Sequence, residues 1–294
     1  MPRPLKLRAM ATGLVCTTLA ACGDSDSSSE PAVIPFSGFS NVPENGTVEI
    51  DGEAVTARYV ADPSTGGVTI EDQTGPSPST TLVTTRNGVV VALSSAASGS
   101  SVSFDTRNGD TRVDTPLVTS FVTADGQDLA TYVDPERAGY EYQTYGAWVT
   151  GAGTGSGTAG AGSYGLKTEA SNIPVGATAT YRGVGLGVAR LSDGQPYQTV
   201  SSVTVTTDFN TATIGSSDTS AVNLNTATTT NAPELDFSGS GSVNGSEFTA
   251  LVSGAGTAGT AQGQFYGPSA NEVGGTFATT GPGDVWHMGA FGGN

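Results

Sequence analysis

Hydrophobic and polar residues alternate in short runs along most of this chain, for example in residues 47–50, 88–93 and 201–206. A period of two is the pattern of a half-buried β-strand, and the abundant Thr and Val favour strands over helices. Two-residue turn signals separate many of the runs. These are Asn-Gly at 45–46, 87–88, 108–109 and 244–245, and Asp-Gly at 51–52, 125–126 and 193–194. The pattern predicts an all-β fold of antiparallel hairpins.

A change of composition near Tyr140 predicts a domain boundary. The hairpin-dense residues 33–139 give way there to the aromatic residues Tyr140, Tyr142, Tyr145 and Trp148. The spacing of Tyr140, Tyr142 and Trp148 predicts that these three rings share one face of a strand. Residues 151–161 are nearly all Gly, Ala, Thr and Ser, which is typical of a flexible loop or of a weak strand. We therefore predict a small N-terminal antiparallel β domain at 33–139 and a second domain at 140–294.

The second domain has the pattern of a closed barrel. About seven strand candidates follow residue 177, and the chain ends on the aromatic run 286–292. A last strand that pairs with the first strand of its domain removes both open edges of the sheet. We therefore expect the C-terminal strand to close the barrel.

The first 32 residues predict export and lipid anchoring. Arg3, Lys6 and Arg8 precede an apolar stretch at 9–21 that is too short to span a membrane, which is typical of a signal peptide at 1–21. The stretch ends at Cys22 and resembles the bacterial lipobox, which implies cleavage before Cys22 and its lipidation, palmitate included. An ordinary cleavage site beside an unrelated cysteine is the alternative. Residues 22–32 are small, polar and acidic, so we expect a flexible tether.

The charge of the chain argues against a nucleic acid partner. The 294 residues carry a formal net charge of −16, and loss of residues 1–21 leaves eight basic residues against 27 acidic ones, or −19. Phosphate backbones are bound by clusters of Lys and Arg, whereas Lys167 is the only lysine left. The acidity fits solubility at a cell surface or attraction to a basic partner. Both cysteines precede residue 23, so no disulfide is expected in the fold.

The stretch GQFYGPSANEVGGTF at 263–277 resembles a motif of the C-terminal β-barrel of the transferrin-binding protein B family of surface lipoproteins. The matching residues are Gly263, Phe265, Tyr266, Gly267, Pro268, Ala270, Glu272, Gly274, Gly275 and Phe277. Residues 179–183, 203–209 and 289–292 are similar to other strands of that barrel. The resemblance implies a soluble eight-stranded antiparallel β-barrel, filled by its own side chains, behind a handle-like domain at 33–139. Residues 33–139 match no known handle closely, so transferrin specificity does not carry over.

The motif itself reads as a strand, a bend and a strand. Pro268 lacks a backbone donor and belongs in the bend. Gly274 and Gly275 have no side chains, so we expect another backbone or an aromatic ring to approach the second strand closely at these positions. Glu272 has no carboxylate partner in the motif, so we expect it to accept hydrogen bonds from backbone or arginine donors. We interpret the motif as scaffold rather than as a ligand site.

Candidate chemistry is sparse. His287 is the single histidine, which argues against a cluster of His and Cys metal ligands and against a Ser-His-Asp triad. The Asp105–Asp110 segment has the carboxylates of a calcium loop but lacks the later glutamate, so a hairpin turn is the better interpretation. The tyrosines around the barrel are either core residues or a partner-facing patch. The candidates for ligand binding are Tyr164, Tyr197 and His287, with no metal, no catalytic residue and no cofactor predicted.

A sharper alternative makes His287 an axial ligand of haem, with Met288 or a tyrosine nearby. The functional hypothesis is a lipoprotein of the outer membrane, at the cell surface, that binds an unknown protein or small-molecule ligand non-covalently, in iron, haem or other nutrient acquisition. It would be a single-lobe relative of transferrin-binding protein B. Gly23 after the cysteine, in place of an aspartate, favours the outer membrane. The alternative is a structural or shielding surface protein without a dedicated ligand.

Overall fold

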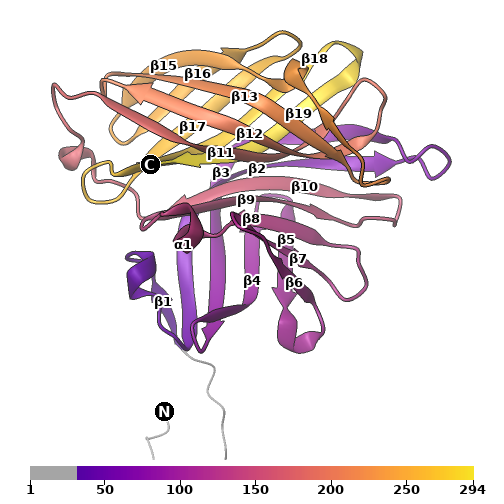
Figure 1. Ribbon diagram of the computed structural model, residues 1–294, viewed down its shortest axis with the longest axis horizontal. Helices are drawn as coiled ribbons and strands as arrows, with labels where there is room; N and C mark the ends of the chain where they lie inside the picture. Colours follow the sequence, from indigo (N-terminus) through magenta and orange to yellow (C-terminus); the bar gives the residue numbers. More distant parts are fainter. Residues whose placement is uncertain (1–31) are drawn as a thin grey trace, which may run out of the picture. The chain divides into compact units, whose positions relative to one another are not determined.

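The computed structural model describes residues 32–294, so the predicted signal peptide, Cys22 and most of the tether lie outside the described residues. Strands dominate the described part, and they form two sheets that follow each other along the chain (Figure 1). All strand pairs are antiparallel except that of β1 with β2. The predicted all-β class is confirmed. The helices are single turns: η1 (Phe39–Asn41), η2 (Thr106–Asn108), α1 (Pro135–Ala138), η3 (Ala170–Asn172), η4 (Pro233–Leu235) and η5 (Pro282–Asp284).

The first sheet, here called the N-terminal sheet, has ten strands. Its order is β5-β4-β3-β2-β10-β9-β8-β7-β6, with β1 added on β2. Its core packs on one face around the rings of Phe104, Phe121, Tyr132 and Trp148. The strands are β1 (Val33–Pro35), β2 (Gly46–Ala61), β3 (Val68–Arg86), β4 (Val89–Ala97), β5 (Ser100–Asp105), β6 (Thr111–Asp114), β7 (Val118–Val122), β8 (Leu129–Val133), β9 (Gln143–Thr150) and β10 (Ser156–Gly165).

The second sheet closes into an eight-stranded antiparallel barrel, as predicted. The last strand, β19, pairs with the first barrel strand, β11, and β12 pairs with β13 to complete the ring, while β14 only extends β13. Phenylalanine rings fill the interior, including Phe248, Phe265 and Phe277. The strands are β11 (Ala179–Arg190), β12 (Pro196–Thr207), β13 (Thr211–Asn223), β14 (Thr229–Asn231), β15 (Ser238–Asn244), β16 (Glu247–Ser253), β17 (Ala258–Tyr266), β18 (Glu272–Gly281) and β19 (Val285–Gly293).

The change from one sheet to the other comes later than the predicted boundary at residue 140. Strands β9 and β10 pair with β8 and β2 of the N-terminal sheet, so the sheet ends at Gly165 and the barrel begins at Ala179. The Gly- and Ala-rich segment turns out to be a central strand from Ser156 onward. Its glycines make room for rings: an added Cβ on Gly160 would lie 2.1 Å from the indole of Trp148. Aromatic side chains such as Trp148 of the neighbouring strand therefore cover the glycines of β10.

The predicted common face of Tyr140, Tyr142 and Trp148 is wrong, because β9 starts only at Gln143. Within β9, Tyr145 and Trp148 are three positions apart and therefore point to opposite faces. Tyr145 packs in a cluster with barrel residues such as Met288, whereas Trp148 packs in the core of the N-terminal sheet. The aromatic run thus contributes to both faces of the strand.

Most turn signals lie where the chain turns, but two do not form the predicted hairpin turn. Asn45-Gly46 leads into β2, and Gly46 is the first residue of that strand and has no positive φ. The dipeptides at 87–88, 193–194 and 244–245 connect β3–β4, β11–β12 and β15–β16, and their glycines have positive φ. Asp51-Gly52 instead lies inside β2, so the turn predicted there is wrong. A Cβ on Gly52 would lie 2.1 Å from the carbonyl oxygen of Ser163, so this glycine allows β10 to approach closely.

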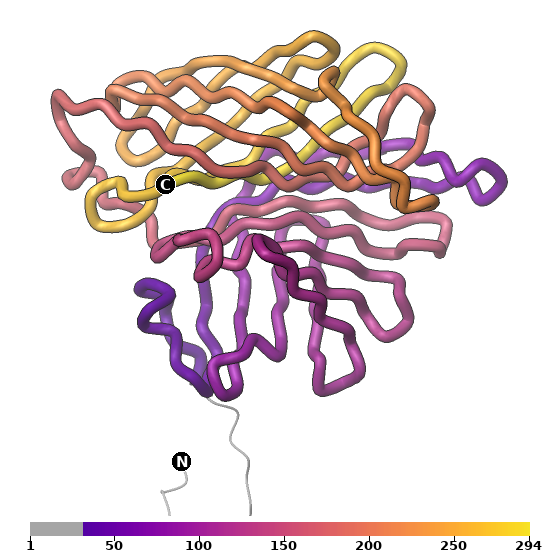
Figure 2. Tube along the Cα trace, viewed as in Figure 1, coloured from indigo at the N-terminus to yellow at the C-terminus, as the bar shows by residue number. Residues whose placement is uncertain are grey.

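The long β2–β3 hairpin reaches from the N-terminal sheet to the barrel (Figure 2). Arg190 Nε of the barrel donates to the Val68 carbonyl at 2.7 Å, and Trp286 Nε1 donates to Gln73 Oε1 at 2.5 Å. At its tip, Asn225 Nδ2 donates to the Gly66 carbonyl at 2.8 Å. These bonds tie one end of the barrel to the N-terminal sheet.

Candidate functional site

The family-like motif forms the hairpin of β17 and β18. Tyr266 pairs with Glu272 across the bend, and Pro268 lies in the bend as predicted. Gly267 has φ +84°, a conformation that glycine adopts without strain. The sequence order of strand, bend and strand is therefore the order in the structure.

Glu272 connects this hairpin to the N-terminal sheet. Its side chain is 4% exposed and accepts backbone hydrogen bonds from Glu141 at 2.7 Å and from Tyr142 at 3.2 Å. Burial raises the pKa of Glu272 to about 7, and the nearby Glu141 adds to the rise, whereas the N–H donors oppose it. Of the two kinds of donor expected for Glu272, these are backbone donors, and they come from the segment just before β9.

Other motif residues contact the same region. Gln143 Nε2 donates to the carbonyls of Val273 at 2.9 Å and Gly293 at 3.1 Å, and Ser163 Oγ and the Tyr266 hydroxyl lie 2.9 Å apart. An added Cβ on Gly274 would lie 2.2 Å from Gln143 Oε1, so a larger residue would have to displace the end of the Gln143 side chain. We call this contact the sheet–barrel junction. The motif residues at it hold the barrel against the N-terminal sheet.

The three residues proposed for ligand binding do not come together. Tyr164 is buried in the core of the N-terminal sheet, with its hydroxyl 3.2 Å from Ser79 Oγ. Tyr197 lies in a separate cluster and donates to Asp193 Oδ2 at 2.6 Å. His287 lies on β19, with Nε2 2.9 Å from Thr199 Oγ1. The three residues form no common site, and a ligand role for any one of them stays a prediction.

His287 is enclosed by its surroundings. The imidazole is 1% exposed, and its ring meets Phe277 edge-on with centroids 4.7 Å apart. Burial lowers the pKa of His287 to about 3, with a smaller opposing effect from the Leu235 backbone, so the ring is neutral. A haem bound here would have to displace both Phe277 and Thr199.

The Asp105–Asp110 segment uses its carboxylates internally. Asp105 accepts from the backbone N–H of Arg107 at 2.9 Å and pairs with its guanidinium. Asp110 accepts from the backbone N–H groups of Asp105 at 2.7 Å and Ala124 at 2.9 Å. Within residues 32–294, no group of three or more His, Cys, Asp or Glu side chains is arranged to hold a metal ion.

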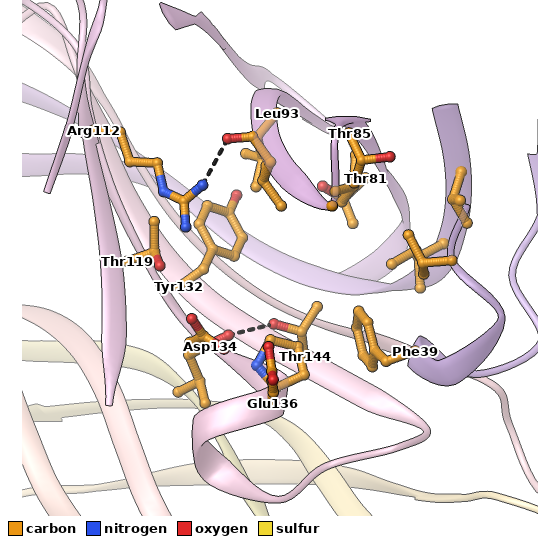
Figure 3. Close-up of a pocket in the computed structure, with 18 of the residues that line it drawn as sticks. Phe39, Thr81, Thr85, Leu93, Arg112, Thr119, Tyr132, Asp134, Glu136 and Thr144 are labelled. Atoms are coloured by element: carbon orange, nitrogen blue, oxygen red, sulfur yellow. Dashed lines mark hydrogen bonds between the residues drawn. The ribbon is translucent and has the colours of Figure 1, made fainter. Parts of the chain in front are cut away.

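A hollow with a largely apolar lining lies in the N-terminal sheet, and we call it the N-terminal cavity (Figure 3). Its volume is about 270 Å³. Seven strands, η1 and α1 contribute to it, which is why no local stretch of sequence indicated it. The residues used below are Phe39, Val42, Glu44, Val48, Ile50, Thr81, Val83, Thr85, Leu93, Arg112, Phe121, Tyr132, Asp134, Glu136 and Thr144.

The wall of the N-terminal cavity is apolar, and its hydroxyls already have partners. Thr81 Oγ1 donates to the Ser94 carbonyl at 3.1 Å, and Thr85 Oγ1 donates to the Pro43 carbonyl at 2.6 Å. Thr144 Oγ1 donates to the Val133 carbonyl at 2.9 Å. Between these groups lie the side chains of Val48, Ile50, Val83, Leu93 and Phe121. A bound group therefore meets a largely apolar wall.

Charged residues surround the opening. Arg112 donates through Nη1 to the Val90 carbonyl at 2.8 Å and pairs with Asp114 at 3.0 Å. Asp134 caps α1 by accepting from the Arg137 backbone N–H at 3.2 Å, and it also pairs with that guanidinium. Figure 3 shows Arg112 and Phe39 on opposite sides of the site.

Two further carboxylates at the opening have no such neutralising partner. Glu44 and Glu136 are exposed, and neither forms an ion pair with another residue of the described chain. Among the charged residues that line the cavity, the two without an ion pair are therefore both acidic.

A second cavity of about 250 Å³ lies between the N-terminal sheet and the barrel. Its apolar wall includes Tyr59, Ile70 and Val149 from the sheet and Val188 and Trp286 from the barrel. The Trp286 indole N–H is already bonded to Gln73, and the Tyr59 hydroxyl donates to the Thr150 carbonyl at 2.8 Å. This cavity has a less charged lining than the N-terminal cavity. Among residues 32–294, no helix has the length and apolar character needed to cross a bilayer.

Comparison with solved structures found several similar proteins. A variant of transferrin-binding protein B from Haemophilus parasuis is 11% identical, with 86% of this chain and 76% of that chain covered and a TM-score of 0.46. Transferrin-binding protein B of Neisseria meningitidis is 10% identical, with 86% and 77% covered and a TM-score of 0.38. The haemoglobin receptor HpuA from Kingella denitrificans is 16% identical, with 88% and 93% covered and a TM-score of 0.35.

A comparison with curated proteins found no match. The family described as the C-lobe and N-lobe β-barrels of transferrin-binding protein B matches residues 173–294, which include the whole closed barrel and its motif hairpin. Over residues 173–294, the barrel of this chain is therefore similar to the β-barrels of transferrin-binding protein B.

Proposed function

We propose that this chain is a lipid-anchored protein of the outer-membrane surface that binds a ligand non-covalently at its N-terminal cavity. The anchor is the predicted lipid on Cys22, which lies outside the described residues, and the surface location follows the barrel family. The observation that carries the proposal is a preformed apolar cavity with an acidic rim. An apolar cavity with few polar groups is the usual form of a binding site. We propose no catalytic role for it.

We propose neither transferrin nor haemoglobin as the ligand of this chain. The matched family is named for transferrin binding, and one similar structure is a haemoglobin receptor. The residues that line the N-terminal cavity all precede residue 145, whereas the family match begins at residue 173. The barrel therefore supports the scaffold and the surface location, and the cavity must select the ligand by its own chemistry.

A capture experiment with a matched variant tests this function. Val42 lies at the cavity and is half-buried, so Val42→Trp fills the opening without placing a large ring in a closed core. The full chain and this variant are immobilised and exposed to native medium or host fluid, and retained molecules are identified by mass spectrometry. We expect a partner that the wild type retains and the variant loses. Partners retained equally by both proteins would contradict a binding role for the cavity.

A structural or shielding role is the second candidate, and one observation favours it. On β15 the outward side chains are Ser238, Ser240 and Ser242, all exposed and uncharged, and they lie opposite Gly215, Thr213 and Thr211 of β13. Such a hydroxyl-rich face suits contact with water rather than with a specific partner. This role predicts that repeated capture experiments recover no partner. It also predicts that deletion of the gene causes no growth defect under iron limitation.

A further inference from the structure

We infer that the N-terminal cavity takes one large apolar side chain from a loop of a protein partner, with basic residues on either side of that side chain. The inference rests on the proposed binding function and adds the chemistry of the partner. It follows from the size of the cavity, the satisfied polar groups of its wall and the charges at its opening.

The size of the cavity suits a side chain better than a cofactor. Its volume is about 270 Å³, below the range of about 300–1,000 Å³ that is usual for pockets holding drug-sized ligands. A single aromatic or long aliphatic side chain is much smaller than such a ligand. A large planar ligand such as haem would exceed the space.

The wall offers little to a polar occupant. The hydroxyls of Thr81, Thr85 and Thr144 are used by backbone carbonyls, and the Tyr132 hydroxyl lies 2.7 Å from Ser95 Oγ. A buried polar group without a hydrogen-bond partner costs about 1–3 kcal/mol in proteins, so polar groups of a ligand would stay outside. The part of the partner that enters the cavity is therefore apolar.

The charges at the opening of the cavity determine which residues of the partner can flank the inserted side chain. Arg112 and Asp134 are already paired within the protein, whereas Glu44 and Glu136 are exposed and form no ion pair with a described residue. The whole chain also carries a formal charge of −16. Charge complementarity steers association and rejects partners of the wrong sign. Lys or Arg residues of the partner therefore lie against Glu44 and Glu136.

The segment Phe39–Ser40, which we call the lip of the cavity, is held in place before any partner binds. The Phe39 backbone N–H donates to the Glu141 carbonyl at 2.8 Å, and Ser40 Oγ donates to Glu141 Oε1 at 2.6 Å. Glu141 in turn donates its own N–H to Glu272 at the sheet–barrel junction. A preformed site loses little conformational entropy on binding. The lip is thus ordered by the same contacts that hold the barrel.

The test uses a phage-displayed library of disulfide-constrained peptides, selected on the full chain and counter-selected on the Val42→Trp variant. We expect the retained peptides to carry Phe, Trp, Leu or Met between Lys or Arg residues. Two synthetic peptides with the same central residue, one with Lys flanks and one with Glu flanks, are then compared. Two exposed ion pairs should favour the Lys peptide by about fivefold to tenfold at low salt, and less at high salt.

Charge reversal at the rim supplies the matched control. The double variant Glu44→Lys/Glu136→Lys should reverse the preference for the Lys peptide. Glu49→Lys makes the same kind of change on the other face of β2, because its neighbours Val48 and Ile50 line the cavity. This control should keep the wild-type preference. Circular dichroism and thermal unfolding check that each variant is folded.

Three other outcomes overturn the inference, and they separate it from the proposed function. Peptides that Val42→Trp excludes, but that carry neutral or acidic flanks, contradict the basic partner and leave the binding role in place. A library without any peptide sensitive to Val42→Trp contradicts the protein partner, and the capture experiment then decides whether the cavity binds anything. Binding of palmitate that Val42→Trp abolishes, with no peptide selected, would assign the cavity to an acyl chain instead.

Discussion

Two buried ionisable residues should give opposite pH dependences of stability that cancel in the wild-type protein. Glu272 is 4% exposed with a pKa of about 7, raised from 4.5, and His287 is 1% exposed with a pKa of about 3, lowered from 6.5. Burial disfavours the charged form of each, so the folded protein keeps both neutral at pH 5–6. The substitutions Glu272→Gln and His287→Gln remove one titration each.

The signs follow from proton binding. The folded pKa of Glu272 is raised, so its contribution to stability is complete below pH 4.5 and disappears as the pH rises to about 7. The folded pKa of His287 is lowered, so its contribution is complete above pH 6.5 and disappears as the pH falls to about 3. Each slope is about 1.4 kcal/mol per pH unit. Between pH 4.5 and 6.5 the two slopes are opposite and equal.

The assay is urea unfolding at half-unit steps from pH 4.5 to 6.5, followed by the fluorescence of the buried Trp148 and Trp286. Relative to the wild type, Glu272→Gln should gain about 3 kcal/mol in free energy of unfolding over this rise in pH, because the His287 slope remains. His287→Gln should lose about 3 kcal/mol over the same rise. The slopes do not depend on the constant cost of each substitution.

An exposed carboxylate provides the control. Glu49→Gln, on the solvent face of β2, should give a curve parallel to that of the wild type. Parallel curves for Glu272→Gln and the wild type would show that Glu272 is ionised throughout this range. The backbone donors of Glu141 and Tyr142 would then outweigh burial, and the assignment of the raised pKa to desolvation would be refuted.

Three further predictions concern the junction, the anchor and haem. Gly274→Ala places a Cβ against Gln143 and should lower the free energy of unfolding by about 1–3 kcal/mol, whereas Gly75→Ala, with nothing within 4 Å, should change the melting temperature little. Cys22→Ala should abolish incorporation of labelled palmitate and release the protein into the soluble fraction. Haem titration should leave the Soret band unshifted, because His287 is enclosed; a shift that His287→Ala removes would establish axial ligation instead.

The barrel could be predicted from sequence because its signals are local. Alternation along each strand, the turn dipeptides and the motif at 263–277 all act within a few residues, and the pairing of β19 with β11 follows from closing the sheet. The central strand β10 was harder to predict because it shows no apolar alternation. Trp148 and Tyr164 cover its glycines, and Gly162 would place a Cβ 2.3 Å from the Tyr164 hydroxyl. The prediction of β10 as a strand therefore depends partly on residues of other strands, such as Trp148 of β9.

The junction and the cavity depend on contacts that no local pattern contains. Glu272 accepts from backbone groups 130 and 131 positions earlier in the chain, so its sequence neighbours give no indication of its partners. The N-terminal cavity draws on residues from Phe39 to Thr144. Alternation in each strand indicates which face is buried, but it does not indicate whether the buried face is fully filled. The cavity exists only where side chains of seven strands meet.

The family match covers the barrel, whereas the proposed ligand cavity lies in the N-terminal sheet. The family match therefore does not determine the ligand. The motif residues Glu272 and Gly274 contact the N-terminal sheet through backbone groups and through Gln143, and the backbone contacts tolerate changes in side chain on the other partner. The N-terminal sheet can therefore vary its cavity while the junction stays the same. A chain that keeps residues 263–277 keeps the support of the cavity lip through Glu141, whatever the cavity binds. Under the proposed function, the rim residues Glu44 and Glu136, rather than the barrel, are therefore the positions at which to test ligand specificity.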